Sequence, residues 1–308
     1  MRIINLYLAC STLLLIPTLS PVLGTEPHVE EVVARILQTR QAILAQLPDD
    51  TGRDALFLTF WDFDGTLLEG DCTEGLPDAA GDGSGYKGLA QACIEAGLSS
   101  IYPAEDGYSA FKADYGHMDH AIGRWLAYPY VGQMLRGAEV EAVRRVVDRH
   151  FEEAIRPFYY DASMKILRAL EAGGVECHIL SASIDLFVDA AASSLELPVG
   201  RFNGIELRIA DGKLTEQIEY PITWADGKTE RLQSIATALR GPQRDRAVFI
   251  LGAFGNSYGT DGPFMKHVAA QQLPVGKPIA LMINGGTAPA AYQGLFWEVE
   301  QTLPYRAQ

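Results

Sequence analysis

Two carboxylates, Asp62 and Asp64, directly follow the apolar run of residues 56–61, and Gly65 and Thr66 come next. The length and aromatic content of this run predict a strand that is buried on both faces. Side chains two residues apart at a strand end point the same way, so the two acids would repel each other without a positive group between them. Gly65 allows the backbone to turn tightly beside a bound group. The alternative interpretation is a polar turn in which both Asp side chains cap loop amides.

Polar residues also follow two later apolar runs, residues 175–180 and 247–251. Ser181 follows the first of these runs, and Asn256 and Asp261 lie in the Gly-rich loop after the second. Ligands of open parallel sheets bind outside the carboxyl ends of the strands. We therefore expect these polar residues to lie beside the first pair of acids.

Lys228 adds a cation to this group, at the start of a helix predicted to precede the last of these strands. Carboxylates, a hydroxyl, an amide and an ammonium group together suit a divalent metal and an oxyanion, most simply a phosphoryl group. Taken alone, Ser181 would be a helix N-cap and Lys228 a surface cation. The combination favours a functional site.

Helical and strand patterns alternate along most of the chain, which predicts an α/β fold with a parallel sheet. Apolar residues at helical spacing predict an amphipathic helix over residues 28–47. Residues 86–158 are largely helical in pattern and have few strand signals, so we interpret them as a helical insertion. The other predicted elements are helices at 164–170, 184–195 and 226–239, strands at 175–180, 247–251 and 278–283, and a β-hairpin over 202–220.

The composition is that of an acidic globular protein. Of the 308 residues, 48% are hydrophobic, which is enough for a sizeable core. The net charge of −14 argues against nucleic acid as a partner, because phosphate backbones bind basic surfaces. Such acidity is also common for solubility alone. The oligomeric state stays open.

Residues 1–24 have the pattern of a secretory signal peptide. Arg2 supplies the positive start, residues 6–23 are apolar and uncharged, and residues 22–24 resemble a cleavage site. We expect cleavage near Gly24, a secreted or periplasmic mature chain and no stable membrane insertion after cleavage. An uncleaved anchor is the alternative.

Secretion makes the cysteines relevant. Cys72 and Cys93 flank a Gly-rich loop and either form a disulfide or stay free, since spacing alone does not supply the required geometry. Cys177 lies within an apolar run, which predicts a buried thiol.

Together, the motif Asp62-Phe-Asp-Gly-Thr66, Ser181, Lys228 and the loop 255–261 resemble, in order and spacing, the four motifs of the haloacid dehalogenase-like hydrolase superfamily. The phosphoserine-phosphatase-like branch of that superfamily is the most similar. The resemblance covers about residues 55–285 and implies a doubly wound parallel Rossmann-like sheet with an inserted helical cap. The implied parts are a core of residues 25–69 and 157–308 and a cap of residues 70–156.

The resemblance also implies a role for each residue of the motifs. Asp62 would be the nucleophile that forms an aspartyl-phosphate, and Asp64 the general acid and base. Mg²⁺ would be held by Asp62, Asp64, Asn256 and Asp261. The phosphoryl oxygens of a small phosphorylated substrate would be bound by Thr66, Ser181, Ala182 and Lys228.

Three acids after the nucleophile, Glu69, Asp71 and Glu74, should face the cap and favour a cationic head group such as that of phosphoserine or phosphocholine. The predicted cap also carries Trp125, Tyr128 and Tyr130, which would suit a quaternary ammonium, as in the secreted phosphorylcholine phosphatases that the chain resembles in this respect. The alternative is a solvated acidic loop and aromatic residues that pack the cap.

The sequence departs from the superfamily at Asn256, where an Asp is usual. An amide oxygen ligates Mg²⁺ but brings no charge, so weaker metal binding is expected unless Asp261 compensates. Two alternatives to a phosphatase follow: a catalytically weak protein that binds a phosphate ligand on the same fold, and a phosphotransferase. The presence of Asp64 favours phosphate transfer over carbon–halogen cleavage, since the dehalogenases lack this second acid.

Overall fold

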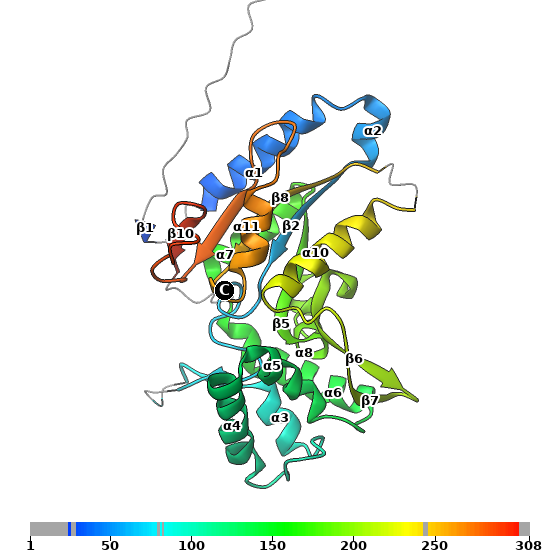
Figure 1. Cartoon of the computed structure of the whole chain (residues 1–308), viewed down its shortest axis with the longest axis vertical. Helices are drawn as coiled ribbons and strands as arrows, with labels where there is room; N and C mark the ends of the chain where they lie inside the picture. Colours follow the sequence, from blue (N-terminus) through cyan, green and yellow to red (C-terminus); the bar gives the residue numbers. More distant parts are fainter. Residues whose placement is uncertain (1–23, 26–28, 79–80, 82, 243–245, 302–308) are drawn as a thin grey trace, which may run out of the picture.

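The computed structural model describes residues 24–25, 29–78, 81, 83–242 and 246–301, and their centre is an eight-stranded sheet (Figure 1). The strand order is β1-β10-β9-β8-β2-β5-β6-β7, and all neighbours are parallel except β6 and β7. The predicted signal segment lies outside the described residues except for Gly24. The strands are β1 (Gly24–Thr25), β2 (Leu56–Trp61), β5 (Glu176–Ile184), β6 (Phe202–Ala210), β7 (Lys213–Glu219), β8 (Val248–Gly255), β9 (Ile279–Ile283) and β10 (Trp297–Glu300).

The strand β2 lies inside the sheet, and its alternate side chains contribute to two separate cores. Phe57 and Trp61 belong to the core that includes residues of α1 and α7. Leu58 and Phe60 belong to the core that includes residues of α10 and α11. Both faces of the sheet are thus covered, and the predicted doubly wound α/β fold is confirmed. The covering helices are α1 (Val29–Leu44), α7 (Asp161–Ala172), α10 (Asp226–Leu239) and α11 (Gly262–Ala269).

Between β2 and α7 the chain is mostly helical, and Figure 1 shows these helices grouped below the sheet. This segment, which we call the cap, contacts β5 and the β6–β7 hairpin through α5. Its elements are β3 (Gly75–Leu76), β4 (Tyr86–Lys87), α3 (Leu89–Glu95), α4 (Gly107–His117), α5 (Arg124–Gln133), α6 (Val140–His150), π-helical turns at Met118–Ile122 and Phe151–Ile155, and a 3₁₀ turn at Arg156–Phe158. The remaining short helices are α2 (Asp49–Asp54), α8 (Asp185–Asp189), α9 (Ala192–Leu195) and a 3₁₀ turn at Val199–Arg201.

The strands β5 and β8 are longer than the apolar runs that predict them. β5 continues to Ile184, which still pairs with Ile205, and β8 continues to Gly255, which pairs with Met282. The sequence pattern predicts that each strand stops at the first small or polar residue. Such residues can still pair with a neighbouring strand through their backbone hydrogen bonds. It also gives no signal for β10, a short strand near the edge of the sheet whose side chains alternate between polar and apolar.

The cysteines Cys72, Cys93 and Cys177 are all buried and free, so Cys72 and Cys93 form no disulfide. The prediction of a buried thiol at position 177 is confirmed. Within the described ranges, no helix combines the length and the apolar character needed to cross a lipid bilayer.

Candidate active site

Asp62 lies directly after β2 and is almost completely buried, with 5% of its surface exposed. Its amide donates a hydrogen bond to the Phe254 carbonyl at 2.9 Å, which fixes the backbone at the strand end. The Thr66 hydroxyl donates to Oδ2 at 3.0 Å, and the Lys228 ammonium donates to Oδ1 at 2.6 Å. Lys228 therefore supplies a positive charge to Asp62, but among the described contacts it pairs with Asp62 and Asp261 and not with Asp64. Burial and the nearby Asp261 raise the pKa of Asp62 to about 7, although Lys228 and Thr66 act in the opposite direction.

Asp261 lies behind Asp62 rather than on the surface of the cavity described below. Its side chain is fully buried, and its Oδ1 accepts a hydrogen bond from the Lys228 ammonium at 2.6 Å. Its Oδ2 accepts hydrogen bonds from the amides of Asn256 and Ser257, each at 3.0 Å. Both carboxylate oxygens thus already have internal donors. The geometry gives Asp261 a supporting place, holding the lysine and the loop that carries Asn256.

Asp64 is held through both of its oxygens. Oδ1 accepts a hydrogen bond from the Cys72 amide at 2.7 Å, and Oδ2 accepts one from the Ser183 hydroxyl at 2.8 Å. The Ser181 hydroxyl is farther from Oδ2, at 3.5 Å. Burial and the neighbouring Asp71 carboxylate raise the pKa of Asp64 well above its usual value. A carboxyl group with such a pKa can carry a proton near neutrality.

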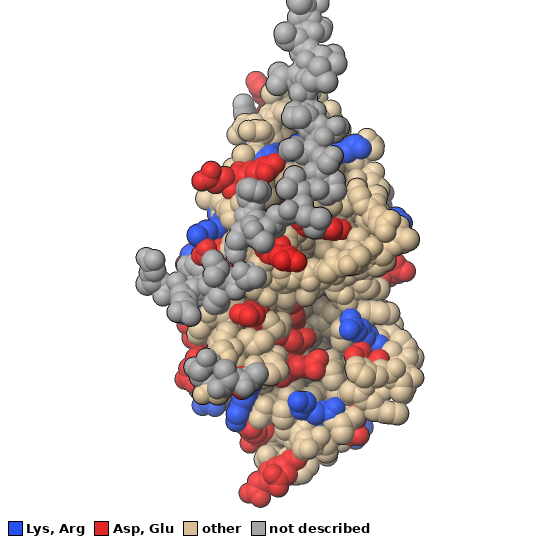
Figure 2. All heavy atoms as spheres, turned by 90° about the vertical axis from the view of Figure 1, so that its left-hand side faces the viewer, with Lys and Arg blue, Asp and Glu red and all other residues tan. Residues whose placement is uncertain are grey.

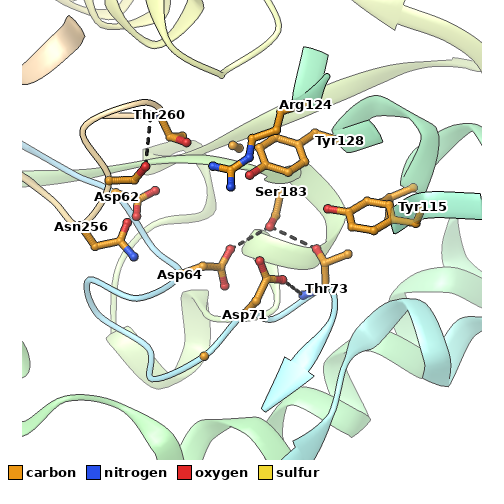
Figure 3. A pocket seen from close by; sticks show the side chains of 14 residues that line it. Asp62, Asp64, Asp71, Thr73, Tyr115, Arg124, Tyr128, Ser183, Asn256 and Thr260 are labelled. Atoms are coloured by element: carbon orange, nitrogen blue, oxygen red, sulfur yellow. Dashed lines mark hydrogen bonds between the residues drawn. The ribbon is translucent and has the colours of Figure 1, made fainter. Parts of the chain in front are cut away.

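These two acids face a cavity of about 160 Å³ between the carboxyl edge of the sheet and the cap (Figure 3). Residues of β5 and of the loops after β2 and β8 line one side, and residues from the cap line the other. In Figure 2, Asp and Glu side chains gather beside a hollow between the upper and lower parts of the molecule. The lining residues are Asp62, Asp64, Gly70, Asp71, Thr73, Tyr115, Arg124, Tyr128, Val131, Ala182, Ser183, Asn256, Ser257 and Thr260.

The cap contributes a cation that the sequence analysis does not identify. Arg124, the first residue of α5, points into the cavity, and its Nε donates to Asp119 Oδ1 at 3.3 Å (Figure 3). Tyr115 and Tyr128 lie beside it, and Arg124 lies over the Tyr128 ring at 5.9 Å from its centroid. A Gly-Arg-Trp segment in a helical block carries no motif, so only the fold reveals that this arginine lines the same cavity as Asp62 and Asp64.

Several predicted residues lie next to the cavity without lining it. Thr66, Ser181 and Lys228 are fully buried beneath it. Glu69 and Glu74 are absent from its wall, whereas Asp71, Ala182 and Asn256 belong to it.

The predicted aromatic group is divided by the fold. Tyr128 lines the cavity, but 53% of the Trp125 surface is exposed and the residue lies outside the lining. The Tyr130 hydroxyl is hydrogen-bonded to Tyr102, at 2.5 Å, within the cap. These three residues do not form a common box.

The donors at the strand ends fit a hard divalent cation. The Asn256 side chain lies against the turn after Asp64, because a Cβ atom at Gly65 would be 1.8 Å from its Nδ2. Asp62 and Asn256 line the same cavity, and carboxylate and amide oxygens are ligands that Mg²⁺ prefers. Acidic groups outnumber basic groups at the site, which favours a bound cation. The four carboxyl groups and two basic side chains are Asp62, Asp64, Asp71 and Asp261, and Lys228 and Arg124.

A second group of potential ligands, Asp64, Asp71 and Cys72, has its ligand atoms within 4.8 Å of one another. Burial and the two carboxylates raise the pKa of the Cys72 thiol well above its usual value. Because metals bind the thiolate, ligation by Cys72 would have to release the proton of this thiol.

Comparison with known proteins matches residues 59–266 to the family model of haloacid dehalogenase-like hydrolases. Among solved structures, a protein of unknown function from Bordetella pertussis Tohama I gives a TM-score of 0.58 at 16% identity, covering 80% of this chain and 98% of that one. Cytosolic 5′-nucleotidase IIIB bound to cytidine gives 0.50 at 15% identity, covering 81% and 78%. A phospho-aspartyl intermediate analogue of phosphoserine phosphatase gives 0.46 at 16% identity, covering 80% and 93%. No curated protein matches the sequence.

Proposed function

We propose that this chain, which belongs to the haloacid dehalogenase-like hydrolase family, hydrolyses a small phosphomonoester, with Asp62 as the nucleophile and Asp64 as the general acid and base. The observation that carries the proposal is the contrast between the two acids. Asp62 is hydrogen-bonded to a buried ammonium at 2.6 Å, which favours its carboxylate form. Asp64 lies in the same cavity wall and has no cation among its described contacts. Burial raises the pKa of both acids, but only at Asp62 does a cation oppose this rise.

The reaction follows from these two protonation states. An oxygen of the Asp62 carboxylate attacks phosphorus, the bond from phosphorus to the ester oxygen breaks, and protonated Asp64 gives its proton to the departing alcohol. Asp64, now a carboxylate, takes a proton from water, whose oxygen attacks the phosphorus of the aspartyl-phosphate. The bond between phosphorus and the Asp62 oxygen breaks, which regenerates the Asp62 carboxylate. Inorganic phosphate leaves, and both acids return to their first state. Lys228 stays in place and offsets the negative charge at Asp62 throughout.

We propose Mg²⁺ as the resident ion. The Asp62 carboxylate, the Asn256 amide oxygen and the backbone carbonyl of Asp64 would hold it, and Asp261 would support this group through Lys228 and the Asn256 amide. When bound, the ion neutralises charge between the nucleophile and the phosphoryl oxygens.

The cap residues that line the cavity favour a substrate whose head group carries both a positive and a negative charge. Asp71 lines the cavity and suits an ammonium group, as the acidic segment after the nucleophile predicts. Arg124 lines the same cavity and suits a carboxylate. Phosphocholine would leave Arg124 without an anionic partner in the head group. We therefore propose a zwitterionic ester of the phosphoserine type over a quaternary ammonium ester.

The function is tested by phosphate release from phosphoserine, phosphoethanolamine, phosphocholine and a sugar phosphate, with Mg²⁺ and with chelator. Asp62→Asn should lower kcat/KM by at least about a thousandfold, because it removes the nucleophile. Asp211→Asn, in the exposed turn between β6 and β7, is the matched control and should keep the wild-type rate. Failure of the wild type to release phosphate from any ester at saturating Mg²⁺ would contradict the proposed function.

The head group is tested separately. Arg124→Gln should reduce kcat/KM for phosphoserine and leave that for phosphoethanolamine nearly unchanged, because the second ester lacks the carboxylate. An equal loss for both esters would instead assign Arg124 to the phosphoryl group.

We also propose that residues 1–24 act as a secretory signal, so that the enzyme works outside the cytoplasm. Mass spectrometry of the chain recovered from the periplasmic or secreted fraction should find a new N-terminus near residue 25. A full-length chain in the cytoplasmic fraction would overturn this.

A further inference from the structure

Ser183 lies at the end of β5, two residues beyond the serine that the family motif singles out, and its side chain lines the cavity. Its hydroxyl donates a hydrogen bond to Asp64 Oδ2 at 2.8 Å, much closer than the 3.5 Å between that oxygen and the Ser181 hydroxyl. The Thr73 hydroxyl in turn donates to the Ser183 oxygen at 3.1 Å (Figure 3). A chain of two hydrogen bonds thus runs from the cap segment to the acid.

The segment that carries Thr73 is itself folded around an acid of the cavity wall. Asp71 Oδ1 accepts hydrogen bonds from the amides of Thr73 and Glu74, at 2.7 and 2.9 Å. The resulting turn presents the Cys72 amide to Asp64 Oδ1 and the Thr73 hydroxyl to Ser183. One short turn therefore controls both oxygens of Asp64, one directly and one through Ser183.

We propose that Ser183 is a positioning residue that orients the Asp64 carboxyl group toward the ester oxygen, and that Thr73 orients Ser183. A carboxyl group with a donor on each oxygen cannot rotate freely. Oδ2 is also approached by the Ser181 hydroxyl at 3.5 Å and the Cys72 thiol at 3.6 Å. Among the described contacts Oδ1 accepts only from the Cys72 amide and keeps a lone-pair position for the transferred proton. The inference rests on the proposed function, since it assigns a partner to the proposed acid. It places the orientation of the acid under the control of the cap segment.

The test uses the fact that leaving groups differ in their need for a proton. The alcohol of an alkyl phosphate leaves as a strong base unless Asp64 protonates it, whereas p-nitrophenolate is stable without protonation. Because kcat/KM reports the steps up to phosphoryl transfer, it is independent of the later hydrolysis of the aspartyl-phosphate. The ratio of kcat/KM for the two substrates therefore measures how well the acid is placed.

Ser183→Ala should lower kcat/KM for the best alkyl phosphate of the panel by roughly ten- to a hundredfold, a part of what general acid catalysis supplies. The value for p-nitrophenyl phosphate should fall less than about threefold, because that step needs no proton. Ser183→Thr, which keeps the hydroxyl, should restore the alkyl phosphate, and Thr73→Val should change the ratio in the same direction as Ser183→Ala but less. Ser194→Ala is the control and should leave the ratio unchanged. It removes a hydroxyl that is hydrogen-bonded to Tyr159, and neither residue lines the cavity.

A proportional loss for both substrates in Ser183→Ala, or no loss for either, would overturn the positioning role. Those outcomes leave the proposed function intact as long as the wild type hydrolyses both esters. If the wild type hydrolyses neither ester, the proposed function itself fails, and the positioning role fails with it.

Discussion

Lys228→Met should lower the free energy of unfolding by about 3–5 kcal/mol, because it removes one partner of a buried ion pair and leaves the charges of the other partners behind. The ammonium is fully buried and lies 2.6 Å from both Asp62 Oδ1 and Asp261 Oδ1. After the substitution, Asp261 retains two amide donors and Asp62 retains the Thr66 hydroxyl. Met has a similar unbranched shape, so lost packing adds little.

The assay is urea unfolding of the metal-free protein at neutral pH, which reports on the ion pairs without any contribution of substrate or Mg²⁺. Lys213→Met is the matched control, since Lys213 pairs with Glu139 at 3.3 Å and both side chains are more than half exposed. Exposed pairs contribute at most about 1 kcal/mol, so this variant should be nearly as stable as the wild type.

A double variant separates the charge from the packing. Lys228→Met combined with Asp261→Asn removes a cation and an anion together, so it should be less destabilised than the sum of the two single variants by about 1–3 kcal/mol. Strict additivity, or a Lys228→Met loss as small as that of Lys213→Met, would refute the conclusion that this lysine compensates two buried carboxylates.

Three further predictions concern other features of the fold. Asn256→Asp should tighten Mg²⁺ binding at least about tenfold, because it adds a formal charge to the donor set; calorimetric titration measures this, and unchanged affinity would exclude residue 256 as a ligand. Gly65→Ala should cost more stability and activity than Gly97→Ala. Both glycines have a positive φ, +74° and +72°, but a new Cβ at position 65 would lie 1.8 Å from the Asn256 side chain, while one at position 97 meets nothing within 4 Å. Equal losses in unfolding assays would contradict this. Asp185→Asn should flatten the pH dependence of stability. Burial raises the Asp185 pKa from 3.8 to about 7, so between these pH values the folded wild type binds a proton that the unfolded chain has lost. The wild type therefore loses up to about 4 kcal/mol of stability as the pH rises from about 4 to about 7. A free energy of unfolding that changes with pH equally in wild type and variant across this range would refute it.

Most of the sheet side of the site is predictable from the sequence because buried parallel strands are recognisable as apolar runs. Apolar runs followed by polar residues locate Asp62, Asp64 and Asn256, and the parallel sheet brings their carboxyl ends to one edge. The same pattern does not distinguish residues that reach the cavity from those that support it. Asp261 and Lys228 belong to the second group, because the loop after β8 folds back over its own acid.

The cap side is not predictable in this way. A helical pattern shows which residues are apolar but does not show which helix end faces a cavity in another part of the chain. Arg124 and Tyr115 carry no local signal for their place opposite the acids. Ser183 is missed for another reason, since the apolar run that predicts β5 stops at Leu180 while the strand continues to Ile184.

Under the proposed function, substrate recognition and acid catalysis share one residue, Asp71. Asp71 lines the cavity where a cationic group would lie, and the same carboxylate holds the turn that presents the Cys72 amide and the Thr73 hydroxyl toward Asp64. A change of charge at Asp71 would therefore alter the head-group site and loosen the acid at once. A substrate of different charge is more readily accommodated at Arg124, which is anchored to Asp119 within the cap and makes no hydrogen bond to the catalytic acids among the described contacts. Under the proposed function, we therefore expect specificity to vary at Arg124 on α5 rather than at the turn that contains Asp71.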